Sequence, residues 1–284
     1  MRAHLPVTSY PVWLAFPLAI GMLLFFVAPL MMLGVVSFYG DMAMTHWGST
    51  VNWAKMFDIF GLYVLVDTLW LGVQVTFLCL VLGFCLAWLF VRMPAKLQPL
   101  VIFIIMLPLL TSVVVRTFAW IVILGKQGIV NNWLIEVGWI SEPTKLLYTR
   151  SGLVVALANV QLPLMVLPLI TALQRIESSL SDASASLGAS EWYTFKKIIM
   201  PLALPGVIAG CLLTFSAAIT AFISQSLIGG GQMLFMPMYL YQQVSALSNF
   251  PFAAVISITF LVTVVLCVTA FNTLGRLSRG YAAG

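Results

Sequence analysis

The sequence predicts an all-α membrane protein that crosses the bilayer six times. Of its 284 residues 62% are hydrophobic and only 7% are charged, and the mean hydropathy is +1.09. A soluble domain has about 25% charged and about 45–50% apolar residues. A water-soluble fold of this length could not bury so much apolar surface, so we expect lipid to be the solvent of this chain.

Six stretches are long and apolar enough to span the bilayer. A helix needs about 20 mostly apolar residues to cross about 30 Å of hydrocarbon. Helices are expected because lipid offers backbone amides no hydrogen-bond partner, and the alternating pattern of barrel strands is absent. The predicted spans are residues 13–38, 66–91, 100–124, 152–173, 202–228 and 250–277, and we interpret residues 1–284 as a single transmembrane domain.

The basic residues predict the orientation of the chain. The formal charge of +5 forms no patch that would bind nucleic acid, because the basic residues cluster at the ends of the predicted spans. An even number of spans places both termini on one side, and the positive-inside rule favours the cytoplasm. That topology leaves Arg116 within a span and four basic residues outside (Lys55, Lys126, Lys145 and Arg150). It places eight inside: Arg2, Arg92, Lys96, Arg175, Lys196, Lys197, Arg276 and Arg279.

No pattern in the sequence indicates an enzyme or a metal site. The only histidines are His4 and His46, both outside the predicted spans, and no HExxH, GxSxG or GxxxxGK[ST] motif is present. The cysteines lie in apolar runs without CxxC spacing, so we predict neither a disulfide framework nor a zinc site. These cysteines are Cys79, Cys85, Cys211 and Cys267.

The most informative segment is residues 174–201, between the fourth and fifth predicted spans. Ser181 is placed to cap a short helix that runs through Leu187, Gly188 to end it at positive φ, and Ser190 to cap the next helix. A helix–glycine–helix that projects from a bilayer is a rigid unit suited to insertion in a groove on another protein.

This segment resembles the "EAA" motif of permease subunits of ATP-binding-cassette (ABC) importers. That motif has an acidic residue, two small residues, three variable positions and a glycine, followed after nine intervening residues by Ile-x-Leu-Pro. The chain keeps every spacing, with Asp182-Ala183-Ser184, then Gly188, then Ile198-Ile199-Met200-Pro201. It departs from the motif at three positions: Asp182 replaces Glu, Ser184 replaces the second Ala and Met200 replaces Leu. The Asp182 side chain is one methylene shorter than that of Glu.

Other stretches resemble polyamine-type permeases, the spermidine/putrescine family of the inner membrane. Residues 107–112, 115–120 and 124–128 are similar to the third span of those proteins, and residues 227–230 are similar to the end of their fifth span. The resemblance extends over most of the chain. It implies a permease that forms the pathway for a small solute, polyamine or a related organic compound, in a bacterial inner membrane.

The resemblance also implies partners and an architecture. It implies a type I ABC importer permease whose core spans, residues 66–277, pair with a second homologous permease, expected to form a heterodimer. Residues 174–201 are then the coupling loop that docks on a separate cytosolic ABC ATPase, which binds the ATP and Mg²⁺, while an extracytoplasmic protein delivers the solute. This chain would bind no cofactor. The residues expected to act in coupling are Asp182, Ala183, Ser184, Gly188, Glu191, Ile198 and Pro201.

Polar residues within spans are costly and are therefore candidates for the translocation pathway. Alternatively, Arg116 snorkels to the external interface and the amides bond between helices. No Asp or Glu lies deep in a span to attract a cation, so an amino-acid-like or phosphonate solute also stays open. An ion-coupled secondary transporter is less favoured, because Arg116 is the only ionisable group placed for a relay. The pathway candidates are Arg116, Asn159, Gln161, Thr220, Ser224 and Gln225.

Overall fold

The computed structural model describes residues 16–282, in which the regular structure consists of helices and one isolated β-bridge. Within this range six helical stretches are long and apolar enough to cross a membrane, which confirms the predicted fold class. The structure does not describe the two chain ends, which include residues 13–15 of the first predicted span. It also does not describe the side chains of Arg2, Arg276 and Arg279. The six stretches are Ala19–Val36, Ile59–Arg92, Val113–Glu136, Arg150–Gln174, Glu191–Ile219 and Phe250–Thr273.

The chain forms two compact units. The first unit consists of two segments, the chain up to Asp58 and Tyr241–Thr259. The second unit consists of Ile59–Leu240 and the chain from Phe260 onward. Two helices contribute residues to both units: α13 (Met236–Ser245) and α14 (Phe250–Ala282). The single domain expected for residues 1–284 stays a prediction.

The first unit contains a helical stretch and a loop that is stabilised by hydrogen bonds to Asp41. α1 (Phe16–Met22), the π-helical η2 (Leu23–Val27) and α2 (Ala28–Val36) follow one another without interruption, and α3 (Val51–Met56) comes after a loop. In that loop a hydrogen bond from the Thr45 hydroxyl and another from the His46 amide stabilise the Asp41 carboxylate and lower its pKa to about 2. The Trp53 ring packs between Phe38 and Phe57.

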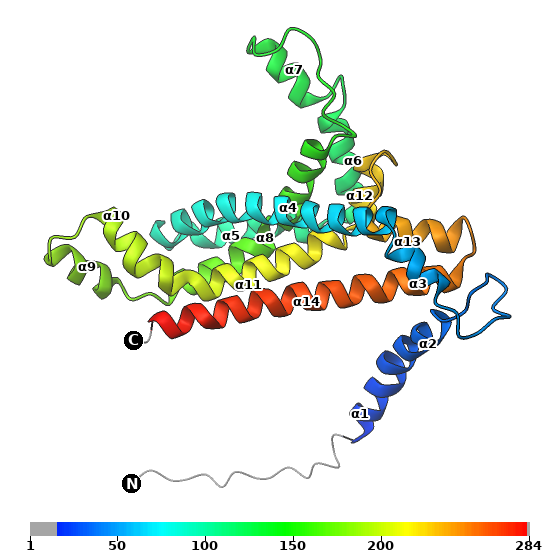
Figure 1. Cartoon of the computed structure of the whole chain (residues 1–284). Helices are drawn as coiled ribbons and strands as arrows, with labels where there is room; N and C mark the ends of the chain where they lie inside the picture. Colours follow the sequence, from blue (N-terminus) through cyan, green and yellow to red (C-terminus); the bar gives the residue numbers. More distant parts are fainter. Residues whose placement is uncertain (1–15, 283–284) are drawn as a thin grey trace, which may run out of the picture. The chain divides into compact units, whose positions relative to one another are not determined.

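The second unit is built on three helices that pack side by side: α4 (Ile59–Arg92), α8 (Arg150–Gln174) and α11 (Met200–Ile219) (Figure 1). Small residues allow this packing, because lipid supplies no hydrophobic force between helices and close contact must replace it. A Cβ added at Gly210 of α11 would lie only 2.7 Å from Met165 Sδ of α8. The buried core of this unit includes Leu71, Val75, Leu153, Met165 and Leu169.

Two predicted spans are broken, so their predicted bounds are wrong. The span predicted at residues 100–124 divides into α5 (Gln98–Leu110) and α6 (Val113–Leu124). The stretch long enough to cross a membrane is instead Val113–Glu136, which comprises α6 and α7 (Ile129–Glu136). Pro108 lacks the N–H of a helical hydrogen bond, and the Thr111 hydroxyl bonds to its carbonyl at 3.1 Å just before the break.

The span predicted at 202–228 breaks at Thr220, where α11 ends and α12 (Phe222–Gly229) follows. The side-chain amide of Gln225 donates to the carbonyl oxygens of Ala218 (2.9 Å) and Ile219 (3.2 Å), which have lost their helical partners. α6 and α12 pack on each other, and the hydroxyls of Thr117 and Ser224 meet there at 3.1 Å. At each break, therefore, a side chain bonds to a backbone carbonyl near the end of the preceding helix.

Two polar contacts link α4 to other helices of this unit. The Arg150 guanidinium, at the start of α8, forms an ion pair with Asp67 and donates to Gln74 Oε1 at 2.7 Å. The Met236 amide at the start of α13 donates to the Thr68 hydroxyl at 2.9 Å. Both contacts join residues far apart in the sequence, so no local pattern indicates them.

The close packing of α8 and α11 can be tested at Gly206. A Cβ at this position would meet the Ala172 side chain and lie 2.7 Å from the Pro168 carbonyl oxygen. We expect Gly206→Ala to cost roughly 1–3 kcal/mol through overpacking and to lower the thermal midpoint of the purified protein by several degrees. Gly34→Ala is the matched control, because nothing lies within 4 Å of its Cβ. Equal thermal midpoints for the two variants would contradict this account of the packing.

Candidate functional site

The loop at residues 174–201, which we call the coupling loop after the role expected of it, leaves α8 and folds into two short helices. The first, α9 (Ser178–Ser186), begins three residues before Ser181, so the prediction that Ser181 caps this helix is wrong. The extended Glu177 occupies the cap position instead, and its carboxylate accepts a hydrogen bond from the Ser179 hydroxyl at 3.2 Å. Ser181 therefore lies inside α9, where it lines a cavity described below.

Gly188 ends α9 as predicted. Its φ is +79°, in the left-handed region that favours glycine. The Gly188 amide donates to the Ala185 carbonyl at 2.9 Å, and the Ala189 amide donates to the Ser184 carbonyl at 3.1 Å. This pair of bonds is the Schellman motif, which satisfies the last carbonyls of a helix and reverses the chain.

The second helix, α10 (Glu191–Thr194), starts where the sequence predicts. The Ser190 hydroxyl oxygen accepts a hydrogen bond from the Tyr193 amide at 3.3 Å, which confirms Ser190 as the N-cap. α10 continues through a π-helical turn, η3 (Phe195–Ile199), into α11, so Pro201 at the start of α11 lies inside one continuous helix. Its missing N–H removes a helical hydrogen bond, and the π-helical turn directly precedes it. The coupling loop is therefore continuous with a core helix at this end.

The outer surface of the coupling loop is apolar and exposed at its tip. Leu187, just before the Gly188 turn, is 89% exposed, and Trp192 is 69% exposed. Asp182, Ala183 and Glu191 are also exposed, whereas Ser184 is buried. Sequence reasoning singled out the acidic and small residues and missed Leu187 and Trp192. An apolar residue next to a turn glycine in a solvent-exposed loop is the signal that would have found Leu187.

An aromatic cluster fixes the coupling loop to α4. The Phe195 ring lies edge-on to Phe84 (5.6 Å between ring centroids) and Trp88 (5.4 Å) of α4, and stacks on Trp192 at 5.6 Å. The Arg92 guanidinium, at the end of α4, lies 4.0 Å from the centroid of the Trp88 ring. No sequence signal could have found this cluster, because α4 and η3 are about a hundred residues apart.

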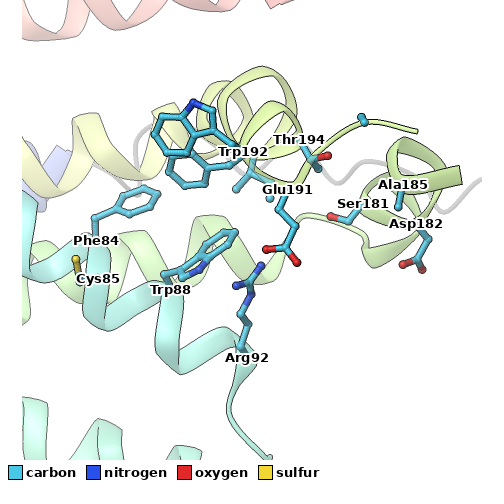
Figure 2. Close-up of a pocket in the computed structure, with 13 residues that line it drawn as sticks. Phe84, Cys85, Trp88, Arg92, Ser181, Asp182, Ala185, Glu191, Trp192 and Thr194 are labelled. Carbon is cyan, nitrogen blue, oxygen red and sulfur yellow. The ribbon is translucent and has the colours of Figure 1, made fainter. Parts of the chain in front are cut away.

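A cavity of about 680 Å³ opens between the aromatic cluster and α9. Aromatic rings and Cys85 line one side, and Ser181, Asp182 and Ala185 of α9 line the other. In Figure 2 the Arg92 guanidinium points toward the Glu191 carboxylate across the cavity. Among the described residues no group of three or more His, Cys, Asp or Glu side chains could hold a metal ion.

The structure separates the candidate pathway residues into exposed and buried sets. Asn159 and Thr220 are exposed, whereas Gln161, Ser224 and Gln225 are buried. Ser224 and Gln225 hold α12 against α6 and the end of α11, as described above. Their role in a pathway stays a prediction.

Arg116 of α6 has unsatisfied hydrogen-bonding groups. Its Nε and Nη1 atoms are buried and find no hydrogen-bond partner among the described residues. A guanidinium remains ionised at accessible pH, so these donors need a partner, and one from outside this chain would serve.

The fold and the exposed coupling loop together define the permease subunit of an ABC importer. Proteins described as "Binding-protein-dependent transport system inner membrane component" match residues 79–278. The chain belongs to this family. It is an integral protein of the inner membrane that acts in transport, and the resemblance to ABC importer permeases of the polyamine type is confirmed.

Individual relatives agree with the family. The spermidine/putrescine transport system permease protein PotB of Escherichia coli (strain K12) is 32% identical over 226 residues, which is 80% of this chain and 82% of the relative. The inner membrane ABC transporter permease protein YdcU of the same strain is 29% identical and covers 90% of both chains. A bacterial ABC transporter involved in alginate import has the same fold, with a TM-score of 0.77, 18% identity, and coverage of 93% of this chain and 96% of that chain.

The left-handed turn at Gly188 can be tested by substitution. No atom lies within 4 Å of a Cβ built there, so only the backbone conformation penalises a side chain. We expect Gly188→Val to cost roughly 1–2 kcal/mol in the turn and to reduce transport severalfold while the protein still inserts. Gly188→Asn should retain more transport, because asparagine tolerates this region. Gly138→Val is the matched control, since Gly138 has φ +77° and an equally open surrounding. An equal loss in both valine variants would argue against a specific role for the Gly188 turn.

Proposed function

We propose that this chain is one permease subunit of a polyamine importer driven by a separate ATPase. The observation that carries the proposal is the exposed α9–Gly188–α10 unit, which presents Leu187 and Trp192 beyond the end of the core helices. The solute class rests on relatives named as spermidine/putrescine permeases, which align with 80% of this chain.

The coupling loop docks in a groove of a cytosolic ABC ATPase. Leu187 supplies an apolar anchor at the tip, while Asp182 and Glu191 supply charge beside it. ATP and Mg²⁺ bind to the ATPase and not to this chain, which has no phosphate-binding GxxxxGK[ST] loop. The excess of basic residues at span ends on the side of this loop supports cytoplasmic termini.

A second permease, most simply a different homologous chain, completes the pathway. The unsatisfied donors of Arg116 support this, because a carboxylate or carbonyl of the second subunit would supply what this chain lacks. An extracytoplasmic binding protein delivers the solute from the opposite side, in keeping with the family description.

The charges in this chain bear on how a cationic solute is selected. Asp67, the acidic residue of α4, already forms an ion pair with Arg150. The positive charge of Arg116 would repel a polyamine. The permease is therefore a weakly selective passage, and the binding protein and the second permease select the cation.

The proposal is tested by purifying this chain with its native partners and reconstituting the complex in nanodiscs and liposomes. We expect an ATPase and a second permease to co-purify. Binding protein loaded with spermidine or putrescine should stimulate ATP hydrolysis severalfold and drive uptake of the labelled polyamine. Stimulation only by an amino acid or a phosphonate would overturn the solute class, and the absence of any co-purified ATPase would overturn the proposal as a whole.

Arg116 is expected to control the dependence of ATP hydrolysis on the binding protein. Arg116→Gln keeps hydrogen-bonding capacity but removes the charge, so it should raise basal ATP hydrolysis or weaken its stimulation. Arg116→Lys should rescue only in part, since an ammonium lacks the planar donor fork. ATPase rates in nanodiscs, with and without binding protein, measure this. Lys126→Gln, which removes an exposed cation beyond the end of the same helix, is the control. If both Arg116 variants match the wild type, Arg116 is a membrane anchor.

A further inference from the structure

The two helices of the coupling loop are joined by a buried pair of hydroxyl groups. Ser184 Oγ of α9 lies 2.8 Å from Thr194 Oγ1 at the end of α10, and each residue is 7% exposed. The surrounding residues of α9 and α10 are largely exposed, so these two side chains form the buried contact between the helices.

The Thr194 hydroxyl has one proton and two neighbouring oxygens. It lies 2.8 Å from Ser184 Oγ, where either hydroxyl can donate, and 3.2 Å from the Ser190 carbonyl oxygen, which can only accept. The Thr194 amide donates to the same carbonyl at 3.0 Å. Thr194 therefore connects Ser184 of α9 to Ser190, which is the N-cap of α10.

Ser184 is fixed to the turn as well as to α10. Its carbonyl accepts the Ala189 amide of the Schellman motif at 3.1 Å, so one residue connects α9, the Gly188 turn and α10. Thr194 is followed directly by Phe195, whose ring packs on Phe84 and Trp88 of α4. The hydroxyl pair thus lies beside the aromatic cluster that contacts the core.

We infer that Ser184 and Thr194 are positioning residues that make α9 and α10 move as one body, so that displacement of the docked tip reaches α4 through Phe195. The inference rests on the proposed docking of this loop on an ATPase. It also accounts for Ser184, where the "EAA" pattern has alanine: in this chain the residue that departs from the pattern has a matching hydroxyl ten residues later.

The test uses the reconstituted complex with spermidine-loaded binding protein and measures uptake per ATP hydrolysed as well as stimulation of the ATPase. Ser184→Ala and Thr194→Val each remove one hydroxyl of the pair, so each abolishes the hydrogen bond between α9 and α10. Each should lower stimulation about fivefold, the factor that one ordinary hydrogen bond contributes to an equilibrium, and should lower uptake per ATP. ATPase stimulation in the Ser184→Ala/Thr194→Val double variant should be no lower than in the single variant with the lower stimulation, because both changes remove the same interaction.

Two further variants separate positioning from stability. Thr194→Ser keeps the hydroxyl and should restore stimulation. Ser186→Ala removes an exposed hydroxyl of the same helix, which bonds only to the Asp182 carbonyl at 2.9 Å, and should behave as wild type. A purely structural role would lower the thermal midpoint and the amount of ATPase that co-purifies while uptake per ATP stayed constant, and that result would overturn the inference.

The outcomes also distinguish this inference from the function on which it rests. In one outcome the wild-type ATPase is stimulated, and the single variants stay within twofold of the wild type in stimulation and in uptake per ATP. That outcome overturns the role of the hydroxyl pair and leaves the proposed function standing. A wild type without stimulation overturns the proposed function and this inference together. Strictly additive losses in the double variant, or failure of Thr194→Ser to restore stimulation, count against the hydroxyl pair itself.

Discussion

The rest of this structure depends on one constraint, the lack of any hydrogen-bond partner for backbone amides in lipid. The constraint makes every spanning segment helical and requires that each interruption be satisfied from within the protein. Gln225 meets that requirement at the end of α11, and the hydroxyl of Thr111 bonds to a carbonyl beside the break between α5 and α6. The broken segments then pack on one another through α6 and α12. The hydroxyls of Thr117 and Ser224 are buried together between these two helices.

The same constraint explains the close contact of the core helices. Because apolar side chains gain little by leaving lipid for protein, α4, α8 and α11 associate through packing at glycines such as Gly72, Gly206 and Gly210. Tight packing makes these helices a stiff body. The coupling loop is attached to this body at three points: covalently to α8 at one end, covalently through η3 to α11 at the other, and by ring contacts between Phe195 and α4. A movement imposed on the exposed tip would therefore have a route into all three core helices.

Charge is scarce in this chain, and the charged side chains on its helices differ in how they are balanced. Arg150 and Asp67 satisfy each other between α8 and α4. Arg92 lies over the face of Trp88, where the ring offers electron density and water remains accessible. Arg116 differs, since two of its nitrogen atoms are buried without a partner in the described chain. In the proposed assembly, a carboxylate or carbonyl of the second permease would supply the missing partner.

The sequence alone determined the helical class, the number of spans, the Gly188 turn and the Ser190 cap. These follow from local physics: apolar length sets a span, only glycine adopts positive φ freely, and a serine hydroxyl reaches an amide three residues on. Tertiary structure alone decided where the third and fifth predicted spans break, that Ser181 lies inside α9, and that Phe195 meets Trp88. It also paired Asp67 with Arg150 and Ser184 with Thr194. Each of these depends on which distant side chain supplies a missing contact, and a pattern along the chain carries no information about that distance.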